Sequence, residues 1–423
     1  MATGIPKAPI LGNIRAIGSL VRLEYPEKQP EHEVLAGPRA ELVDIGSLTH
    51  GDSENGQFFY GDNLPILRTL LDDYREKVQL IYIDPPFASS GNYATRSLDH
   101  AYEDDLHGHH YIEFIRKRLV VLRELLSPTG SIYVHLDANM AFHIKVVMDE
   151  VFGPQNFRNF ITRKKCNPKN FTKNSFGNIS DYILFYSKSS ECHFNRQYEP
   201  WTEETSKKEY QYIDEGGRRF KKVPLHAPGT RNGATGQPWR GKNPPPGKHW
   251  QYPPDVLEEM DRRGEIYWSP NGNPRRKIYL DNSQGIPIQD IWLDVKDPHN
   301  QNIRITGYPT EKNQGVLERI ILASSQPGDL VLDAFAGSGT TMAAAFAHGR
   351  RCLGIDRSPE SLRTVLGRFM YGLSRMGDFV GSKPSEESKQ LGFSFGSVHL
   401  AAEKSQASEA LDIFQAAVGR KVA

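Results

Sequence analysis

The tetrapeptide Asp84-Pro85-Pro86-Phe87 directly follows the apolar run LIYI. The aspartate carboxylate and the first proline carbonyl can both accept hydrogen bonds, and proline brings no competing N–H donor. The exocyclic amine of a planar base is a poor nucleophile because its lone pair is delocalised into the ring. Two acceptors on its protons would free that pair, and Phe87 could stack on the base. The tetrad therefore predicts activation of an aromatic amine, although Asp-Pro is also common in plain strand-ending turns.

A glycine loop in the run VLDAFAGSGTT forms the second cluster. An apolar strand leads through Asp333 into Gly337 and Gly339, and a helix and a second strand ending at Asp356 follow. Glycines let the backbone approach a ligand, and the second acid can accept hydrogen bonds from ribose hydroxyls. The loop is shorter than GxGxxG and no GxxxxGK[ST] occurs, which excludes a P-loop. The loop is therefore better interpreted as a site for a nucleoside without phosphates, such as S-adenosylmethionine, than as a plain strand-to-helix turn.

Short apolar strands alternate with amphipathic helices on both sides of a long central segment, which is typical of an α/β sheet with helices on both faces. We expect the last two strands before that segment to close the sheet as an antiparallel edge pair. The expected strands are 57–62, 78–87, 131–137, 157–165, 181–188, 329–335 and 351–356, and the expected helices are 64–74, 111–126, 140–151, 314–324, 341–347 and 361–373.

These elements divide the chain into five parts. The parts are an N-terminal extension (1–56), a catalytic half (57–189), an insertion (190–303), a cofactor-binding half (304–376) and a C-terminal tail (377–423). We therefore expect the strands of one sheet to come from two stretches of the sequence, one on either side of an insertion. We expect the tail to be polar and loose as far as a short amphipathic segment near Leu411. The extension indicates no particular structure.

Basic and aromatic residues interleave between residues 158 and 304. Such a surface offers charges that neutralise phosphates and rings that stack on bases, although an ordinary solvated loop region would look similar. Beside the tetrad, DNA recognition is the better interpretation. The candidate DNA contacts are Arg163, Lys164, Lys165, Trp239, Arg240, Arg275 and Arg276.

Composition sets the remaining bounds. Lys and Arg number 52 against 51 Asp and Glu, so the overall charge does not by itself indicate a polyanion partner. Cys166, Cys192 and Cys352 show no metal-ligand spacing, and we predict no metal site. No apolar run approaches the roughly 18 residues of a membrane span, and the first residues lack a signal-peptide core. We therefore expect a soluble, cytoplasmic protein.

The order of the motifs resembles the beta class of amino-group DNA methyltransferases, the circularly permuted arrangement in which the catalytic motif precedes the cofactor motif. The similarity covers residues 57 to about 370 and is strongest to adenine-specific methylases related to Type III modification subunits. It implies a Rossmann-like methyltransferase sheet, a target recognition domain in the insertion and S-adenosylmethionine as cofactor. The motifs are GDNLPILRTL, IYIDPPF, GSIYVHLD, DYILFYSK, YPTEK, DAFAGSGTT and GID.

The resemblance also implies roles for single residues. The tetrad would be catalytic, and two departures from the family pattern, Ala334 and Asn313 in place of prolines, affect the expected loop geometry. The implied cofactor residues are Asp333, Phe335, Gly337, Gly339 and Thr340 in the methionine-end loop, Asp356 at the ribose, Asp62 near the adenine, and Lys312, which follows Pro309 and Thr310 in the motif before the loop.

Together these observations predict transfer of the sulfonium methyl to the N6 amine of adenine in duplex DNA, with the base flipped out. Cytosine N4 is the first alternative, since enzymes of that kind in the resembled class usually carry serine where Asp84 stands. Other planar amines on RNA or protein, and a DNA-binding component with decayed catalysis, are further alternatives. The implied partners are double-stranded DNA, a second copy of the chain, and a restriction or defence system whose nuclease would be another subunit.

Overall fold

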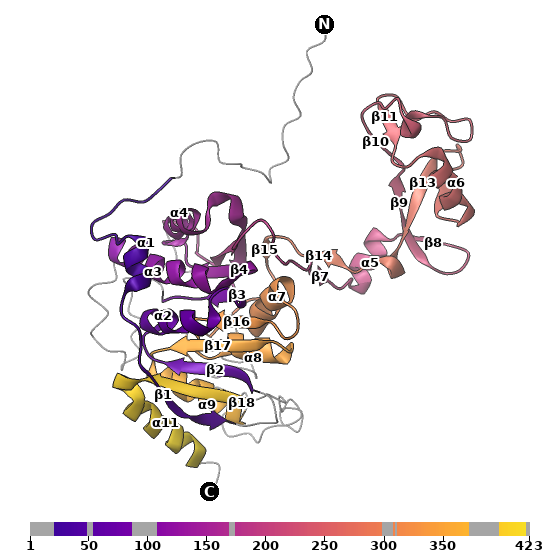
Figure 1. Ribbon diagram of the computed structural model, residues 1–423. Helices are drawn as coiled ribbons and strands as arrows, with labels where there is room; N and C mark the ends of the chain where they lie inside the picture. Colours follow the sequence, from indigo (N-terminus) through magenta and orange to yellow (C-terminus); the bar gives the residue numbers. More distant parts are fainter. Residues whose placement is uncertain are drawn as a thin grey trace. The chain divides into compact units, whose positions relative to one another are not determined.

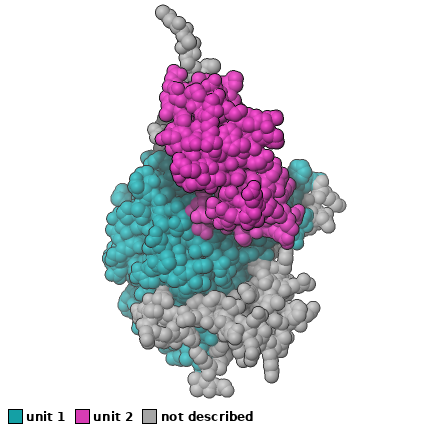
Figure 2. Space-filling model, turned by 90° about the vertical axis from the view of Figure 1, so that its right-hand side faces the viewer, with its two compact units in different colours: residues 1–195, 289–423 teal, residues 196–288 magenta. Residues whose placement is uncertain are grey.

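The chain folds into two compact units (Figure 2). The larger, here the sheet unit, consists of residues 1–195 and 289–423, and the smaller, here the small unit, is Arg196–Ile288, which lies within the predicted insertion. The computed structural model describes residues 21–48, 54–86, 108–168, 174–297, 308, 311–371 and 397–419.

A ten-stranded mixed sheet forms the centre of the sheet unit (Figure 1). Its strands are β1 (Leu42–Leu48), β2 (Glu54–Tyr60), β3 (Val78–Ile83), β4 (Leu126–Leu136), β5 (Phe157–Lys164), β6 (Ser180–Ser187), β15 (Ile291–Trp292), β16 (Leu330–Asp333), β17 (Arg351–Asp356) and β18 (Ser397–Glu403). Their order is β1-β18-β2-β17-β16-β3-β4-β6-β5-β15. The strands from β18 to β4 run parallel, and β1 and β6 are antiparallel to their neighbours. The predicted doubly covered α/β sheet is therefore confirmed.

Helices cover both faces of this sheet. They are α1 (Glu31–Ala36), α2 (Asn63–Tyr74), α3 (His109–Leu125), α4 (Ala141–Phe152), α7 (Gln314–Ser324), α8 (Thr340–Ala347), α9 (Pro359–Tyr371) and α11 (Ala407–Gly419). Ile81 and Val134 belong to the apolar core that α2, α3 and α4 share. The hydroxyl of Tyr133, one residue before Val134, instead hydrogen-bonds that of Ser324 in α7 at 2.7 Å. Because successive strand residues point to opposite faces, α7 lies opposite α3 and α4.

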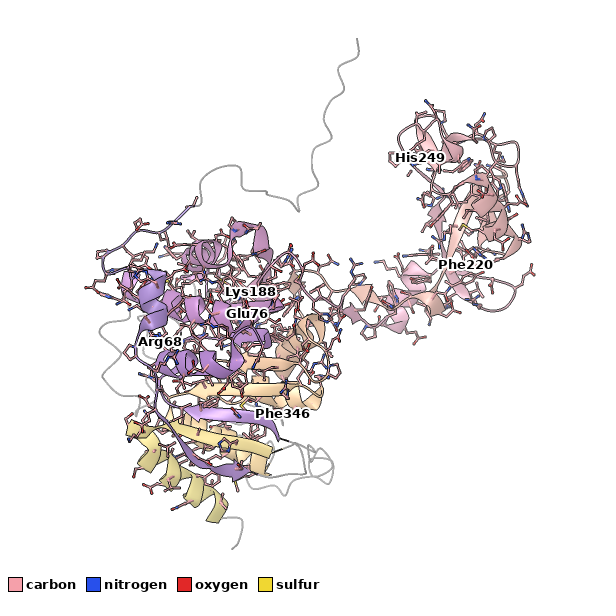
Figure 3. The ribbon with its side chains drawn as sticks, in the orientation of Figure 1. Arg68, Glu76, Lys188, Phe220, His249 and Phe346 are labelled. Carbon is pink, nitrogen blue, oxygen red and sulfur yellow. The ribbon has the colours of Figure 1, made fainter. Side chains whose placement is uncertain are left out.

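The two ends of the chain meet in the sheet. β18 lies between β1 and β2, so the tail contributes an inner strand and the expectation of a loose tail is wrong for residues 397–403. This short run follows a polar stretch and has no periodic neighbours in the sequence, and it is stabilised by pairing on both sides. Arg68 in α2 (Figure 3) donates to the carbonyls of Val34 and Pro38, at 2.7 and 3.1 Å, and holds the segment around α1.

The predicted edge pair is only partly correct. β5 and β6 do pair antiparallel, with Ile161 opposite Ile183. β15, however, pairs parallel with β5 and forms the last strand of the sheet. A two-residue strand inside a loop-rich stretch has no detectable period, which is why the sequence did not reveal it.

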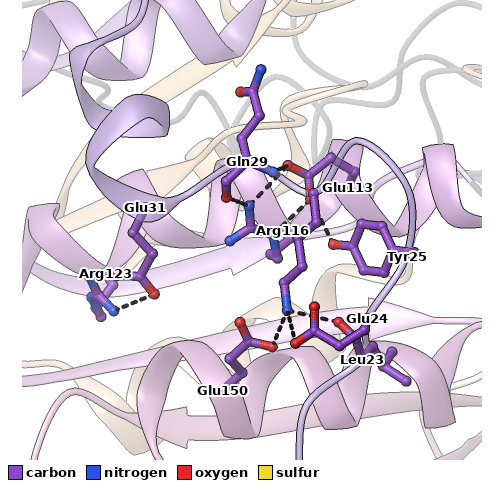
Figure 4. Close-up of polar contacts among 10 residues, drawn as sticks. Leu23, Glu24, Tyr25, Gln29, Glu31, Glu113, Arg116, Arg123 and Glu150 are labelled. Carbon is purple, nitrogen blue, oxygen red and sulfur yellow. Dashed lines mark hydrogen bonds and ion pairs between the residues drawn. The ribbon is translucent and has the colours of Figure 1, made fainter.

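The segment before α1 is fastened to α3 by a buried carboxylate (Figure 4). Glu113 accepts hydrogen bonds from the Tyr25 hydroxyl at 2.6 Å, from the Gln29 N–H at 3.1 Å, and from Arg116 at 2.7 and 2.9 Å. Burial opposes ionisation of Glu113, but these donors outweigh it and lower its pKa. Two ion pairs flank this cluster, Lys28 with Glu150 and Arg123 with Glu31. We call Tyr25, Gln29, Glu113 and Arg116 the N-terminal clamp.

The small unit has its own sheet and core. A four-stranded antiparallel sheet of order β12-β13-β9-β8 packs near α6, and its core contains Trp239 and Trp250 with Leu257 and Ile266. None of the described helices of either unit is long and apolar enough to cross a membrane. The elements of the small unit are β7 (Tyr198–Glu199), α5 (Glu203–Glu209), β8 (Tyr212–Ile213), β9 (Arg219–Pro224), β10 (His226–Pro228), β11 (Lys248–Trp250), α6 (Pro254–Arg262), β12 (Ile266–Trp268), β13 (Pro274–Tyr279) and β14 (Ile286–Pro287).

Candidate active site

The tetrad and the glycine loop follow two neighbouring strands. β3 pairs parallel with β16, with Tyr82 opposite Asp333, so Asp84 comes two residues after the partner of Asp333. The chain leaves β3 through α3 toward β4, and it leaves β16 through α8 toward β17 on the other side. Ligands of open α/β sheets bind where such connections diverge, outside the carboxyl ends of the strands. The two halves of the sequence therefore join in one sheet and share this crevice.

The carboxyl edge of the sheet is acidic. Five neighbouring parallel strands, β2, β17, β16, β3 and β4, each end in or are soon followed by an aspartate. This concentration of negative charge suits a cationic ligand and disfavours a phosphate. In sheet order the residues are Asp62, Asp356, Asp333, Asp84 and Asp137.

The two carboxylate oxygens of Asp84 have different surroundings. Oδ2 lies 2.5 Å from the Nζ of Lys312, whose side chain is 9% exposed. Oδ1 is buried and has no hydrogen-bond partner among the described residues. Lys312, expected at the cofactor, is thus placed against the tetrad. Pro85 is buried, Pro86 is exposed, and Phe87 lies outside the described residues, as do Pro309 and Thr310.

Asp333 ends β16 and is almost fully buried, 2% exposed. It accepts hydrogen bonds from the Phe335 N–H at 2.9 Å and from the Thr341 hydroxyl at 2.5 Å. Burial nevertheless raises the pKa of Asp333 to about 7, because two neutral donors do not replace the water that a carboxylate loses. Asp84 and Asp356 act in the same direction. A cation bound in the crevice would relieve this penalty.

The glycine loop has the backbone that its residues predict. Gly337 and Gly339 have φ angles of 49° and 73°, in the left-handed region that favours glycine. A Cβ on Gly337 would lie 3.3 Å from the Tyr308 ring. The carboxylate of Asp356 accepts the N–H groups of Gly337 and Ser358, both at 2.8 Å, and burial raises its pKa. Asp356 therefore stabilises the conformation of the glycine loop and lies directly beside it.

Asp62 is held by a residue that the sequence analysis missed. Arg118 in α3 is 4% exposed and lies 3.0 Å from the Asp62 carboxylate and 2.5 Å from the amide oxygen of Asn63. The Asn63 amide in turn donates to the Ala334 carbonyl at 2.6 Å. The β2–α2 turn is thus tied to the glycine loop. Arg118 lies within an amphipathic helix pattern, and only its three-dimensional partners distinguish it.

Thr340 is also bound within the fold. The guanidinium of Arg368 in α9 donates to the Thr340 hydroxyl at 2.9 Å and to Glu311 at 2.7 Å, and all three side chains are buried or nearly so. Glu311 precedes Lys312, so Arg368 connects the start of α8 with the segment that reaches Asp84. Sequence spacing gave no signal for Arg368.

Asn313 and Ala334, the two departures from the family pattern, both have a structural role. Asn313 is the N-cap of α7: its side chain accepts the Gly315 N–H at 2.9 Å and donates to the Lys296 carbonyl at 2.6 Å. Ala334 is buried and its carbonyl binds Asn63. Both positions are therefore well accommodated without proline.

A chain of buried polar groups connects β3, the strand that precedes the tetrad, with β4, β6 and β5. The Tyr82 hydroxyl lies 2.7 Å from Nδ1 of His135, and Nε2 of His135 lies 2.9 Å from Asp181. Arg163 binds Asp181 through two hydrogen bonds and Asp297 at 2.8 Å. Burial opposes ionisation of Asp181, but its interactions with His135 and Arg163 outweigh this effect and hold the pKa of Asp181 well below its usual range. The network braces the strand that carries Asp84.

The predicted DNA contacts divide into two groups. Arg163 and Trp239 are 0% and 3% exposed and belong to the network above and to the core of the small unit. They are not available to DNA, contrary to the prediction, because interleaving of basic and aromatic residues does not reveal burial. Arg240 is paired with Glu258 and Asp261, and Arg276 binds the Tyr252 hydroxyl. Arg275 is exposed, and Lys164 and Lys165 are partly exposed.

Comparison with known proteins decides the family. A family described as DNA methylase, with N6 and N4 specificities in its name, matches residues 78–366. The chain belongs to this DNA methylase family. The resemblance predicted from the motif order is confirmed, and S-adenosylmethionine is the methyl donor of the family.

Several individual proteins are similar to this chain. The Type II methyltransferase M.EcaI of Enterobacter cloacae is 44% identical over 376 residues, which cover 88% of this chain and 83% of that protein. The StyLTI Mod subunit, a Type III restriction-modification enzyme of Salmonella typhimurium, is 28% identical over 345 residues, 72% of this methylase and 52% of that subunit. The solved PvuII DNA methyltransferase (cytosine-N4-specific) covers 89% of this chain and 97% of its own, at 16% identity and a TM-score of 0.45.

Proposed function

We propose that this methylase transfers a methyl group from S-adenosylmethionine to the N6 amine of adenine in duplex DNA, at a defined sequence and with the base flipped out. The observation that carries the proposal is the position of Asp84. Its buried Oδ1 has no hydrogen-bond partner among the described residues, and it follows the strand next to the glycine loop. An acceptor left open beside a cofactor crevice is what amine activation requires.

Asp84 and Pro85 act as hydrogen-bond acceptors for the amine, and Lys312 positions Asp84. Oδ1 of Asp84 and the carbonyl of Pro85 each accept a hydrogen bond from one N–H of the amine, which localises the nitrogen lone pair. Lys312 holds Oδ2 at 2.5 Å and so fixes the direction of Oδ1. The bound cofactor supplies an electrophilic methyl on a sulfonium. A nitrogen–carbon bond forms as the carbon–sulfur bond breaks with its electrons on sulfur, and the proton lost from nitrogen passes to Asp84 or to water.

The cofactor contacts follow from the carboxyl edge. We assign the ribose hydroxyls of the cofactor to Asp356 and its cationic methionine end to the loop after Asp333. We place its adenine near Asp62, whose carboxylate is bound by Arg118. Gly337 and Gly339 allow the ligand to approach the backbone. A net positive cofactor gains from the row of aspartates in this crevice, whereas a phosphate-bearing dinucleotide would be repelled.

Adenine is favoured over cytosine because an aspartate heads the tetrad, while the cytosine-N4 enzymes that the sequence resembles usually carry serine there. The carboxylate accepts without donating, which suits the two N–H groups of either exocyclic amine, so the preference for adenine rests on the residue type at the head of the tetrad. Cytosine N4 remains the second candidate, since the matching family includes both specificities. We also propose that the chain modifies the sites of a restriction system, as the name of the StyLTI relative suggests.

One measurement tests base and position together. The chain is expressed in a host without DNA amino-methylation, and the host DNA is digested to nucleosides for mass spectrometry and sequenced for modified positions. We expect N6-methyladenine within one short sequence and nothing in cells that express Asp84→Ala. N4-methylcytosine alone would move the assignment to the second candidate. No methylated base at all, with folded wild-type protein present, would reject the proposed function.

A further inference from the structure

The four-stranded sheet of the small unit has two unlike faces. Side chains alternate between the faces of a strand, and the cross-strand register fixes which residues share a face. Ile266 and Trp268 in β12 pack into the core with Leu257 and Met260 of α6, which lies along one side of the sheet in Figure 1. Arg276 is paired with Ile266 across β12–β13 and binds Tyr252, which packs against the same core.

The other face is basic and aromatic. Lys222 in β9 is directly opposite Lys277 in β13, and Arg275 lies two residues before Lys277 on the same strand. The ammonium of Lys222 lies 3.5 Å from the ring centroid of Tyr212 and 3.4 Å from that of Tyr267, so these rings belong to the same face. We call these five residues the basic face.

The charges of the basic face are not balanced by ion pairs within the small unit. The four strands contain six Lys and Arg residues and no Asp or Glu, and three of the six, Lys222, Arg275 and Lys277, lie on the basic face. In the fully described small unit no ion pair joins Lys222, Arg275 or Lys277 to an acid. Three cations in or beside the helix α6, in contrast, have acidic partners: Arg240 pairs with Glu258 and Asp261, Arg262 with Glu259, and Arg263 with Glu265.

Two lysines directly opposite each other on one face repel, and such a pair disfavours the sheet. The tyrosine rings offset part of this cost, because a cation over an aromatic face is attracted by the ring. They also hold the ammonium of Lys222 in a defined place. A fold that keeps like charges fixed and open on one face is arranged for an anion that spans several of them.

We infer that the basic face binds the phosphate backbone of duplex DNA. The inference rests on the proposed function and names the surface through which the small unit meets its substrate. Lys222, Lys277 and Arg275 would contact phosphates, and Tyr212 and Tyr267 would add hydroxyl donors beside them. Backbone contacts of this kind position a protein on the duplex without reading its sequence. Of the two neighbouring arginines predicted from the sequence, Arg275 makes the contact and Arg276 supports the core.

The test compares two triple variants. One removes three positive charges from the basic face, and the other removes three positive charges from other parts of the small unit. The face variant is Lys222→Ala, Arg275→Ala and Lys277→Ala, and the control variant is Lys207→Ala, Arg262→Ala and Arg263→Ala, with the same change in net charge. Affinity for a fluorescent duplex is measured by anisotropy across a salt series. Each lost phosphate contact should reduce the magnitude of the negative slope of log K against log salt by about 0.9, and affinity at 0.1 M salt should fall by about two orders of magnitude.

The control variant should bind as the wild type does, and both variants should bind S-adenosylmethionine normally. The Arg275 side chain is exposed, so the single variant Arg275→Ala protects the test against misfolding, and the magnitude of its slope should be smaller by about 0.9. An unchanged slope in both face variants would overturn the inference, as would equal losses in the control. Selective loss of single-stranded DNA or RNA binding, with duplex binding intact, would assign the face to another partner and also overturn it.

The same proteins separate this inference from the proposed function. If the wild type methylates duplex DNA and the face variants do so with unchanged affinity, only the assignment of the surface fails. If the wild type transfers no methyl group to any DNA, the proposed function fails, whatever the face variants do.

Discussion

The carboxyl edge of the sheet and the N-terminal clamp both contain buried carboxylates among polar neighbours, but they use them differently. In the clamp, both oxygens of Glu113 accept hydrogen bonds, and its donors come from Tyr25, Gln29 and Arg116 (Figure 4). At the carboxyl edge, Asp84 has one oxygen against Lys312 and the other buried without a hydrogen-bond partner among the described residues.

The pKa values of the two regions shift in opposite directions. Burial acts on both, yet the clamp lowers the pKa of Glu113, whereas Asp333 at the carboxyl edge has its pKa raised to about 7. A buried carboxylate with enough hydrogen-bond donors adds stability. One with too few donors costs stability and can gain the missing interactions from a bound ligand. Charge type and burial alone therefore do not separate structural acids from functional ones, whereas the count of donors does.

The largest effect is expected when the open acceptor at Asp84 is removed. Asp84→Ala deletes both oxygens, and we expect methyl transfer to fall by about 10²- to 10³-fold, the range seen when one preorganised polar group is lost. Binding of S-adenosylmethionine should change only a few-fold, because the glycine loop is untouched. Single-turnover methylation and equilibrium dialysis measure the two quantities.

Asp72→Ala provides the matched control, since the Asp72 side chain is 62% exposed and, in the part of the chain that the structure describes, forms an ion pair only with Arg39. Its activity should equal that of the wild type. A variant without the Asp84 carboxylate that still turned over at the wild-type rate would show that this acid is not the acceptor.

Much of the carboxyl edge could be predicted from the sequence, because its chemistry is tied to local geometry. The helix 314–324 and the strand 351–356 have the predicted bounds, and most other elements differ by a few residues. Gly337, Gly339 and Asp356 stand at fixed distances from a strand end, so the loop could be identified by its spacing. Asp84 and its prolines also follow a strand directly.

The supporting residues could not be predicted, because they act across long sequence separations. Arg118 reaches Asp62 from α3, and Arg368 reaches Glu311 from α9. In the sequence each is one arginine on an amphipathic helix. Arg163 was misread for the related reason that a basic residue beside lysines resembles a surface cluster, whereas its β5 position points into a buried network.

The next largest effect is expected at Asp333, where function and stability should move in opposite directions. Its pKa is raised from 3.8 to about 7, so the charged form is penalised in the folded state. This penalty is absent below about pH 4, grows between pH 4 and 7, and is complete above pH 7. Asp333→Asn should therefore stabilise the cofactor-free protein at pH 8 by about 1 to 3 kcal/mol and leave it little changed near pH 4.

The same substitution should weaken S-adenosylmethionine binding by about 10- to 100-fold at pH 8, since a charge-assisted contact is lost. In the wild type, affinity for the cofactor should rise as the pH passes through 7. Urea denaturation at several pH values, with and without the cofactor, and calorimetric titration measure both effects. Equal stability of wild type and variant across this pH range would contradict the raised pKa.

The smallest effect should come from the clamp, and it should touch stability alone. Tyr25→Phe removes the hydroxyl that donates to Glu113 at 2.6 Å, and hydrogen bonds to charged groups contribute about 1.5 to 3 kcal/mol. Because Arg116 and the Gln29 N–H still serve the carboxylate, we expect a loss near 1 kcal/mol at pH 7. The loss should shrink as the pH falls through the lowered pKa of Glu113, since the stability that a depressed carboxyl adds is present above the unfolded pKa and disappears in acid. Methylation rate and cofactor affinity should remain those of the wild type, and a drop in either would show that the clamp serves the site rather than the fold.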